Sequence, residues 1–295
     1  MNIYSAISSN KKKTWAVMLL FVLVITTIVF VFSKALGYGL GFAGFALLLA
    51  GITSIGSYYY SDKLVLATSG AKQIQKSDNP ELFRIVENLC IGDGLPMPRI
   101  YISDDPSPNA FATGRDPNHA VVCVTTGILQ IMTKVELEGV IAHELSHVKN
   151  FDIRLMAIVA ILVGFIAIIS DLFLRITFFS NSREDNRGNT LFLVIGIIFA
   201  IISPLAAALI QLSVSRKREY LADASGVLLT RYPEGLALAL EKLLQDKTPP
   251  KYASNATAHL YIENPFDNKK VKNMFTGLFN THPPLEERIK ILRSM

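Results

Sequence analysis

Two histidines and a glutamate stand together near the middle of the chain, in the segment HELSH that runs from His143 to His147. Positions four apart share one face of an α-helix, so both imidazoles can bind one metal ion through neutral ring nitrogens. Glu144 lies one residue along, which keeps its carboxylate out of the ligand set yet near a water on the metal. There it can take a proton and pass it to a leaving amine, so the pattern predicts zinc-dependent hydrolysis of a peptide bond.

This chemistry requires a helix, and the residues before HELSH indicate where that helix begins. Thr133 and Glu136 fit a capping box, in which each side chain binds a free backbone amide of the first turn. The alternative is a chance match, which this chain's composition gives on the order of one time in a hundred. We therefore expect a helix from Lys134 onward. Its apolar stripe is formed by Val135, Val140, Ile141 and Leu145.

A catalytic zinc site needs a third protein ligand, and the longer pattern HExxHxxGxxH is absent. Glu219 and Asp223 instead stand four apart in the segment SRKREYLADASG, which is rich in helix formers. We expect Glu219 to be the third ligand and Asp223 to accept the free ring N–H of a ligating histidine. Without HELSH in the same chain, the pair would indicate only a solvated helix face.

The composition raises the question of a membrane, because 51% of the 295 residues are hydrophobic and only 18% are charged. Four stretches are long and apolar enough to cross a bilayer, namely 15–33, 38–60, 155–173 and 191–212. Asp171 and Arg175, near the end of the third, can neutralise each other, although such a pair can also line an ion or substrate path. Pro204 in the fourth can be accommodated as a kink.

Basic residues near the span ends predict the orientation. Lys11, Lys12 and Lys13 outnumber Lys34 in the turn after the first span, which places the N-terminus in the cytoplasm. Two spans separate HELSH from Glu219, so both parts of the site are expected on that side. The expected division is 1–60 for a tail and two spans, 61–154 for a cytoplasmic segment with the HELSH helix, 155–212 for two further spans, and 213–295 for a cytoplasmic helical segment with the third ligand.

The cysteine content and the charge argue against a disulfide-stabilised protein and against a nucleic-acid-binding protein. Cys90 and Cys123 are the only cysteines, so there is neither a disulfide framework nor a CxxC metal pair, and both are expected to be buried. The net charge of +5 comes largely from lysines and arginines that flank the spans. No basic stripe with interleaved aromatics is present, so a nucleic-acid partner is not expected.

The segment between the second and third spans predicts a small sheet. Residues 79–89 indicate an amphipathic helix, and 99–103, 110–113 and 120–125 indicate strands that include an exposed hairpin. An edge strand can pair with the backbone of an extended substrate, which would give binding with little sequence preference. An ordinary hairpin edge is the other interpretation. The substrate strand would consist of Asn109, Ala110, Phe111 and Ala112.

Five segments spread over nearly the whole chain carry a resemblance to a known family, namely SPNAFATG at 107–114, HELSHVKNFD at 143–152, SRKREYLAD at 215–223, AHLYIENP at 258–265 and THPP at 281–284. On these segments the chain resembles the HtpX group of membrane zinc metalloproteases, which are related to the CAAX prenyl endoproteases. One departure is Phe151, where the group commonly has a basic residue.

The resemblance implies an α-helical integral membrane protein with a mainly α (α+β) cytoplasmic zincin-type metalloprotease domain that carries a small β-sheet. It implies one Zn²⁺ per chain, with Glu144 as the catalytic residue. It further implies cleavage of misfolded or damaged membrane proteins at the cytoplasmic face of a bacterial inner membrane, as part of quality control and the stress response. An ATP-dependent membrane protease with overlapping clients is a candidate partner.

His282 has two interpretations. It precedes two prolines and the segment LEERIKIL, so it can be a residue at a helix entry. The resemblance favours a catalytic role, as a hydrogen-bond donor to the oxyanion of the tetrahedral intermediate.

Two other classes of protein remain to be weighed. A scaffold or chaperone with a structural zinc would usually supply four protein ligands, and only three have convincing spacing here. A transporter would need paired broken helices, and only Pro204 interrupts a span. The ligand set would also suit cobalt or manganese.

Overall fold

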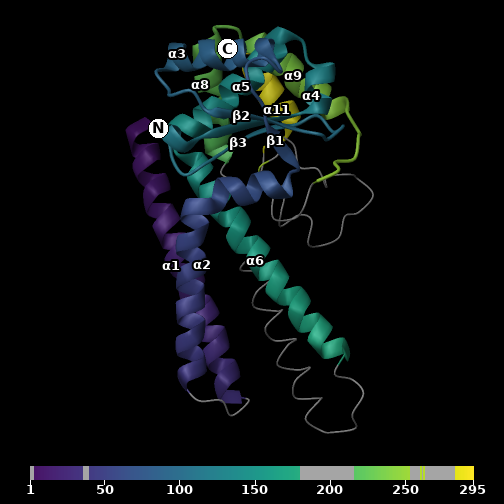
Figure 1. Ribbon diagram of the computed structural model, residues 1–295. Helices are drawn as coiled ribbons and strands as arrows, with labels where there is room; N and C mark the ends of the chain where they lie inside the picture. Colours follow the sequence, from purple (N-terminus) through teal and green to yellow (C-terminus); the bar gives the residue numbers. More distant parts are fainter. Residues whose placement is uncertain (1–2, 36–39, 180–215, 253–259, 261, 263–282) are drawn as a thin grey trace.

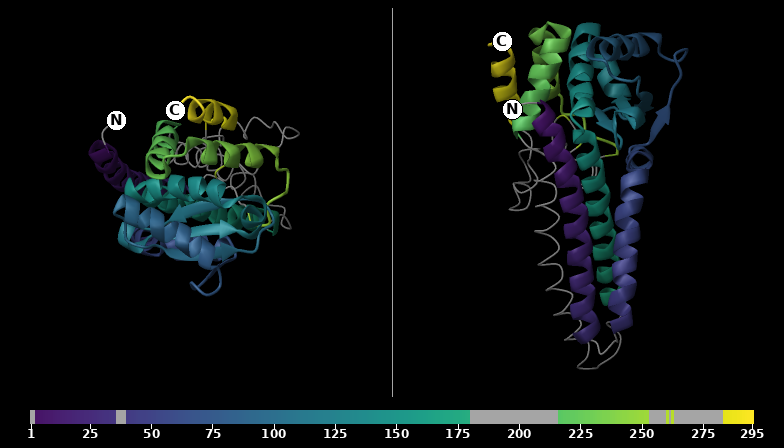
Figure 2. Two further views of the ribbon diagram at one scale, coloured as in Figure 1. Left: turned by 90° about the horizontal axis from the view of Figure 1, so that it is seen from above. Right: turned by 90° about the vertical axis from the view of Figure 1, so that its left-hand side faces the viewer.

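The computed structural model describes residues 3–35, 40–179, 216–252, 260, 262 and 283–295. Three long helices, α1 (Ile3–Ala35), α2 (Leu40–Thr68) and α6 (Asp152–Phe179), run from one side of a head that is built from the other elements (Figure 1). Figure 2 shows the same three helices side by side, and each packs on the other two. The chain is therefore mainly helical, with one small mixed sheet in its head.

The expected spans fall only partly within the described residues. The stretches 15–33 and 155–173 lie in α1 and α6, and most of 38–60 lies in α2, whereas 191–212 lies outside the described residues. In the described part of the chain, no helix combines the length and the apolar character needed to cross a membrane.

The sheet has four strands, β1 (Ala71–Gln73), β2 (Arg99–Ser103), β3 (Ala110–Thr113) and β4 (Val121–Thr125), in the order β1-β2-β4-β3. The central pair β2 and β4 is parallel, and both outer pairs are antiparallel. The three strands predicted from the sequence are thus confirmed, and β3 lies at an edge. The prediction that the hairpin is exposed is wrong, because all four residues of β3 are buried against α5, α6 and α2.

The main core of the head lies between this sheet and the helices α3 (Pro80–Asp93), α5 (Lys134–Lys149) and α9 (Pro233–Gln245). Asn79 caps α3 as its side chain accepts from the amide of Leu82, at 3.0 Å. Val140, Ile141 and Leu145 of α5 pack into the core as predicted, whereas Val135 is 46% exposed, so its prediction as part of that face is wrong. The remaining helices of the head are α4 (Thr126–Ile131), α8 (Arg216–Thr230) and α11 (Leu285–Leu292), with a 3₁₀ turn η1 (Pro117–His119).

The start of α5 agrees with the prediction, and it fixes the phase of HELSH. The Thr133 amide donates to Glu136 Oε2 at 2.7 Å, and the Lys242 ammonium of α9 reaches the same oxygen at 2.6 Å. Partial burial acts to raise the pKa of Glu136, but the hydrogen bonds from Lys242 and Thr133 outweigh it and hold the pKa below its usual value. Glu136 thus joins the first turn of α5 to α9.

This arrangement predicts a pH-dependent contribution to stability. An unfolded glutamate titrates at about 4.3, so the contribution of Glu136 is complete above that pH and is lost as the pH falls through its lowered folded pKa. Glu136→Gln can keep the cap but not the ion pair, and it should lower the free energy of unfolding at pH 7 by less than about 1 kcal/mol because Lys242 is partly exposed. Glu136→Ala should cost about 1 to 2 kcal/mol, since it also removes the cap.

Thermal unfolding of the wild type and both variants between about pH 2 and pH 7 measures these effects, because this range includes the pH values below the unfolded pKa. The difference between the wild type and Glu136→Gln should shrink toward the acid end of this range. A difference that stays constant or grows as the pH falls would show that the charge of Glu136 does not stabilise the fold.

Candidate metal centre and active site

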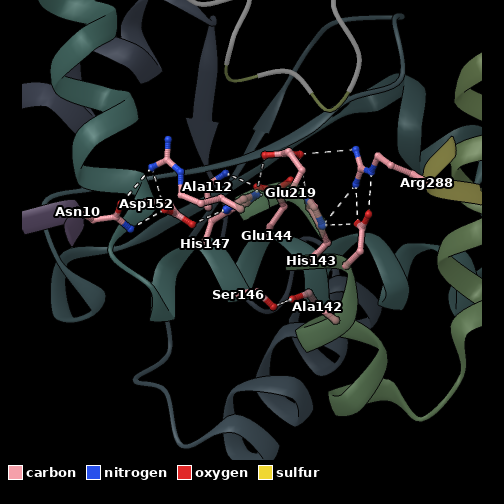
Figure 3. A network of polar contacts seen from close by, with 12 residues as sticks. Asn10, Ala112, Ala142, His143, Glu144, Ser146, His147, Asp152, Glu219 and Arg288 are labelled. Atoms are coloured by element: carbon pink, nitrogen blue, oxygen red, sulfur yellow. Dashed lines mark hydrogen bonds and ion pairs between the residues drawn. The ribbon is translucent and has the colours of Figure 1, made fainter. Parts of the chain in front are cut away.

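Helix α5 brings both histidines of HELSH to one point. Their Nε2 atoms lie 3.2 Å apart, and both side chains are buried (Figure 3). The hydroxyl of Ser146, which lies between them in the sequence, donates to the Ala142 carbonyl and so turns back onto the helix. The i,i+4 spacing therefore places two metal-binding nitrogens side by side, as the sequence predicts.

Helix α8 supplies the third group. Glu219 Oε2 lies 3.7 Å from His143 Nε2, and Glu219 Oε1 lies 3.5 Å from His147 Nε2. The two helices approach closely at Gly226, where a Cβ atom would lie 3.1 Å from the backbone nitrogen of His143. His143, His147 and Glu219 form the metal-binding group of the described residues, with potential ligand atoms within 4.8 Å of one another.

The three donors fit zinc. At Zn–N distances of about 2.0 to 2.1 Å, tetrahedral ligand atoms lie roughly 3.3 Å apart. The three separations of 3.2, 3.5 and 3.7 Å are close to that value. Two imidazoles and one carboxylate are also a ligand set found in catalytic zinc sites, in which the fourth position is left to water or substrate.

A carboxylate binds the Nδ1 atom of each histidine and so orients its ring. His143 Nδ1 lies 2.9 Å from Asp223 Oδ1, and His147 Nδ1 lies 3.0 Å from Asp152 Oδ2. When each Nδ1–H donates to its carboxylate, the lone pair of each Nε2 points to the common centre, which is the tautomer that a metal requires. The structure thus places Asp223 where the sequence predicts it, and Asp152 takes the corresponding place at the other histidine.

The electrostatics around His147 favour a positive charge. Burial by itself lowers its pKa, but the hydrogen bond to Asp152 and the nearby carboxylates of Glu219 and Glu144 outweigh burial and raise the pKa to about 9. In the absence of a metal ion, a proton on the ring can supply this positive charge. The same carboxylates would stabilise a bound cation.

Two buried arginines complete the surroundings of the ligands. Arg288 of α11 donates to both oxygens of Asp223, at 2.9 and 2.7 Å, and its Nη1 lies 3.6 Å from Glu219 Oε2. Burial alone would raise the pKa of Asp223, but Arg288 and His143 hold it below its usual value. Arg218, beside Glu219 in the sequence, donates to Asp152 Oδ1 at 3.1 Å.

Helix α1 also reaches the site. The Asn10 side chain donates to Asp152 Oδ1 at 2.6 Å and to the Asn150 carbonyl at 2.9 Å, and it accepts from Arg218 at 3.2 Å. Asn10 is 2% exposed. A residue near the N-terminus therefore holds the carboxylate that orients His147 (Figure 3).

The charges of this cluster fit a divalent cation. Among the described residues, four buried carboxylates face two buried guanidinium groups. A divalent cation such as Zn²⁺ would bring the charges of these six groups into balance when both histidines are neutral. The carboxylates are those of Glu144, Asp152, Glu219 and Asp223, and the guanidinium groups are those of Arg218 and Arg288.

Glu144 and β3 meet beside the ligands. The Ala112 amide donates to Glu144 Oε2 at 2.9 Å, and Asn109 Oδ1 accepts from the Ile262 amide at 3.2 Å. Burial raises the pKa of Glu144, and Glu219 adds to this, while the two histidines and the Ala112 amide oppose it. The structure therefore places a buried carboxylate between the metal-binding group and the edge strand.

Several residues of the site are not evident from sequence. Asn10 and Arg218 carry no local signal, because their partners lie far along the chain. Arg288 does carry one, since it stands on the same face of its helix as the apolar Leu285, Ile289 and Leu292, where a charged residue needs a buried partner. His282 lies outside the described residues, so its role stays a prediction.

The fold and the site together define a metallopeptidase, with the HExxH helix, a distant glutamate and an edge strand beside them. The chain belongs to Peptidase family M48, whose model matches residues 76–295. The resemblance predicted from the sequence is confirmed.

Relatives of similar length support this assignment. The chain is 47% identical to a "Protease HtpX homolog" of Tropheryma whipplei (strain Twist), over 99% of this chain and 98% of that protein. It is 46% identical to the protein of the same name in Dictyoglomus turgidum, over 99% and 94% of the two chains. The crystal structure of S. mikatae Ste24p has a similar fold, with a TM-score of 0.51 and 19% identity over 95% of this chain and 66% of that chain. The protein is thus a metalloprotease of the HtpX type.

Asp152 binds His147, and Asn10 binds Asp152, so a substitution at either residue should change the affinity for zinc. Asp152→Ala should weaken zinc binding by about 10- to 100-fold, the usual effect of removing a carboxylate that orients a ligand. Asn10→Ala should weaken it by about tenfold, at the low end of that range, because Arg218 still holds Asp152.

Competition with a chromogenic chelator measures both affinities. Asn88→Ala, on the exposed face of α3, is the matched control and should bind zinc as the wild type does. Zinc affinity unchanged in Asn10→Ala would show that α1 does not support the site.

Proposed function

We propose that the protein is a membrane-embedded zinc endopeptidase that cleaves misfolded or damaged membrane proteins at the cytoplasmic face of a bacterial inner membrane. The observation that carries the proposal is the convergence of His143, His147 and Glu219 on one point beside the Glu144 carboxylate. Peptidase family M48 and the relatives named as proteases support the hydrolytic part. The substrate class and the cellular role follow from the resemblance to the HtpX group.

His143, His147 and Glu219 would hold the zinc ion. When bound, zinc supplies a Lewis acid that polarises the scissile carbonyl and lowers the pKa of a water toward neutrality. Asp223 and Asp152 keep the two imidazoles in the ligating tautomer. The protein itself fixes the positions of the three ligand atoms in a buried site of low dielectric constant.

Glu144 would act as the general base and then as the general acid. Its burial disfavours the charged form, so the carboxylate gains from taking a proton and can hold it on an oxygen. From there it can deliver the proton to the leaving amine. The Ala112 amide fixes one of its oxygens, which leaves the other free to turn toward the water.

The edge strand β3 would align the substrate. Its inner edge pairs with β4, and its outer edge faces α5, where the Ala112 amide binds Glu144. A peptide that adds to Asn109, Ala110, Phe111 and Ala112 would lie along the metal-binding group, and one of its carbonyls would compete with Glu144 for the Ala112 amide. Because β3 is buried, access requires a rearrangement around it. His282 would complete the site as an oxyanion donor.

The surface of the long helices supports a membrane environment. Most of the exposed large hydrophobic side chains lie on α1 and α2, including Leu19 at 70%, Ile52 at 68% and Leu48 at 67%. Contiguous exposed apolar surface of this kind marks contact with a membrane or a partner. We propose that a bilayer covers it.

A belt of aromatic and cationic side chains lies where these helices meet the head, and we name it the interfacial belt. Trp15 stacks on Tyr58 at 6.2 Å, and the Arg154 guanidinium lies over Tyr58 at 5.4 Å. Aromatic and basic residues of this kind concentrate at the boundary between hydrocarbon and water. The belt also contains Lys11 over Phe151, Lys63 over Tyr60 and Arg115 over Tyr59.

The rival function is a scaffold with a structural zinc ion. Such a site would usually close with a fourth protein ligand, and among the described residues the metal-binding group has three members. Glu144 favours catalysis, because a buried carboxylate beside the ligands has no purpose in a purely structural site. An ATP-dependent membrane protease with overlapping clients is a further partner that we propose.

Glu144→Gln separates catalysis from metal binding. It should lower cleavage of an unfolded test protein by at least about 100-fold, the lower bound for losing a general base, while zinc content stays unchanged. Detergent-purified enzyme with measured zinc content is the material. Glu138→Gln removes a charge from the same helix and is the matched control, with activity near that of the wild type. Equal cleavage by Glu144→Gln and the wild type would contradict the proposed mechanism.

The cytoplasmic orientation can be tested with one introduced thiol. Cys90 and Cys123 are 3% and 0% exposed, and burial raises the pKa of both thiols, that of Cys90 to about 11. The wild type should therefore resist a membrane-impermeant maleimide. Arg84→Cys, on the exposed face of α3, should react only after the inner membrane has been permeabilised. Reaction in intact spheroplasts would place the head on the other side.

A further inference from the structure

A polar pocket opens within the interfacial belt, and its lining includes none of the three residues of the metal-binding group. It has a volume of about 610 Å³. The last turns of α2, the start of β2 and the connection from β3 to β4 form its walls. The residues that matter for its chemistry are Tyr59, Tyr60, Lys63, Arg99, Arg115 and His119.

The pocket carries an excess of positive charge. Arg99 binds Asp62, and Arg115 Nε lies 3.6 Å from Asp116 Oδ2. Lys63 is exposed and lies over the Tyr60 ring at 5.2 Å, and it has no carboxylate partner among the described residues. The pocket therefore offers one ammonium group that is free to bind an anion, next to two guanidinium groups already held in place.

Its donors match a phosphodiester. A phosphate oxygen accepts from lysine and arginine in charge-assisted hydrogen bonds, and tyrosine hydroxyls can donate as well. Asp116 binds His119 Nδ1 at 2.8 Å, while His119 Nε2 lies 2.6 Å from an Arg115 nitrogen. Asp116 and His119 thus hold Arg115 in the wall of the pocket.

The position along α2 identifies the source of the phosphate. Ile55 is 59% exposed and lies one turn before Tyr59, whereas Lys63 lies one turn after it. An exposed apolar position and an exposed basic position thus lie about two helical turns apart, roughly 12 Å, and a headgroup region of about 5 to 8 Å per leaflet fits between them.

We propose that this pocket binds the headgroup of an anionic glycerophospholipid, with Lys63 and Arg115 as the principal contacts to its phosphate. The proposal rests on the membrane placement in the proposed function. A bound headgroup would fix the height of the head above the bilayer, since α2 carries both the pocket wall and the apolar surface below it. Zwitterionic lipids would bind less well, because their own cation would face Lys63.

Quenching of Trp15 fluorescence by brominated lipids measures the binding of lipid near the pocket. It is the only tryptophan, and it stacks on Tyr58 next to the pocket wall. The full-length chain is reconstituted into phosphatidylcholine vesicles that contain either brominated phosphatidylglycerol or brominated phosphatidylcholine, and quenching of Trp15 gives the relative binding constant of the two lipids. Basic residues at a membrane surface each contribute about a fivefold preference, so the wild type should prefer phosphatidylglycerol by about fivefold or more.

Two double variants give the comparison. Lys63→Gln with Arg115→Gln should bring the ratio of binding constants close to one. Arg84→Gln with Lys290→Gln removes the same charge from exposed positions on α3 and α11, and it should keep the wild-type ratio. Zinc-dependent cleavage of the test protein by both double variants shows that they are folded.

The other possible results contradict the headgroup site, the lipid as the source of the phosphate, or the membrane placement. Equal quenching by both lipids in the wild type, or an equal loss of preference in both double variants, would exclude the headgroup site and leave the protease untouched. Loss of the preference on adding glycerol 3-phosphate would assign the pocket to a soluble phosphate ester. Absence of quenching by either lipid would reject the membrane placement itself, and so would be distinguishable from failure of the pocket alone.

Discussion

The burial of four carboxylates around two histidines is the constraint on which the rest of the structure depends. Each carboxylate is removed from water and needs a compensating charge or hydrogen bond. The compensation comes from elements far apart in sequence, namely Asn10 of α1, Arg218 of α8 and Arg288 of α11. A metal ion at His143, His147 and Glu219 would add positive charge to the same cluster. Folding of the head and binding of the metal are therefore linked, because neither the ligands nor their supports converge in an unfolded chain.

The same constraint explains why helices α5 and α8 lie so close. Glu219 must reach two nitrogens that belong to the opposite helix, and this requires that backbone approach backbone. Gly226 permits the approach, since a Cβ atom there would lie 3.1 Å from the His143 nitrogen. Phe151, with φ of 60°, forms the left-handed corner after α5 from which Asp152 points back to His147. Local backbone geometry at these two positions thus sets the geometry of the donors.

Sequence predicted the parts of the site that follow from local periodicity. HELSH on a capped helix, and Glu219 and Asp223 one turn apart, each require only the 3.6-residue repeat, and the structure brings these residues together. Three of the four strands of the head were also predicted, and β1 was not. The burial of β3 was not predicted either, because its own residues say nothing about the helices that cover it. Asn10 could not be found at all, since its contact with Asp152 spans 142 positions and leaves no local pattern.

The contact between Asn10 and Asp152 gives α1 a role beyond that of an anchor. An amide is suited to this position, because it can donate to a carboxylate and accept from Arg218 at once, which neither an aspartate nor a lysine can do. A displacement of α1 would leave Asp152 with Arg218 alone and would loosen the ring of His147. Since α1 also carries exposed apolar surface, the environment of that surface and the order of the metal-binding group are mechanically connected. The geometry of the ligands therefore depends on how α1 packs against α6 and α8, not on the head alone.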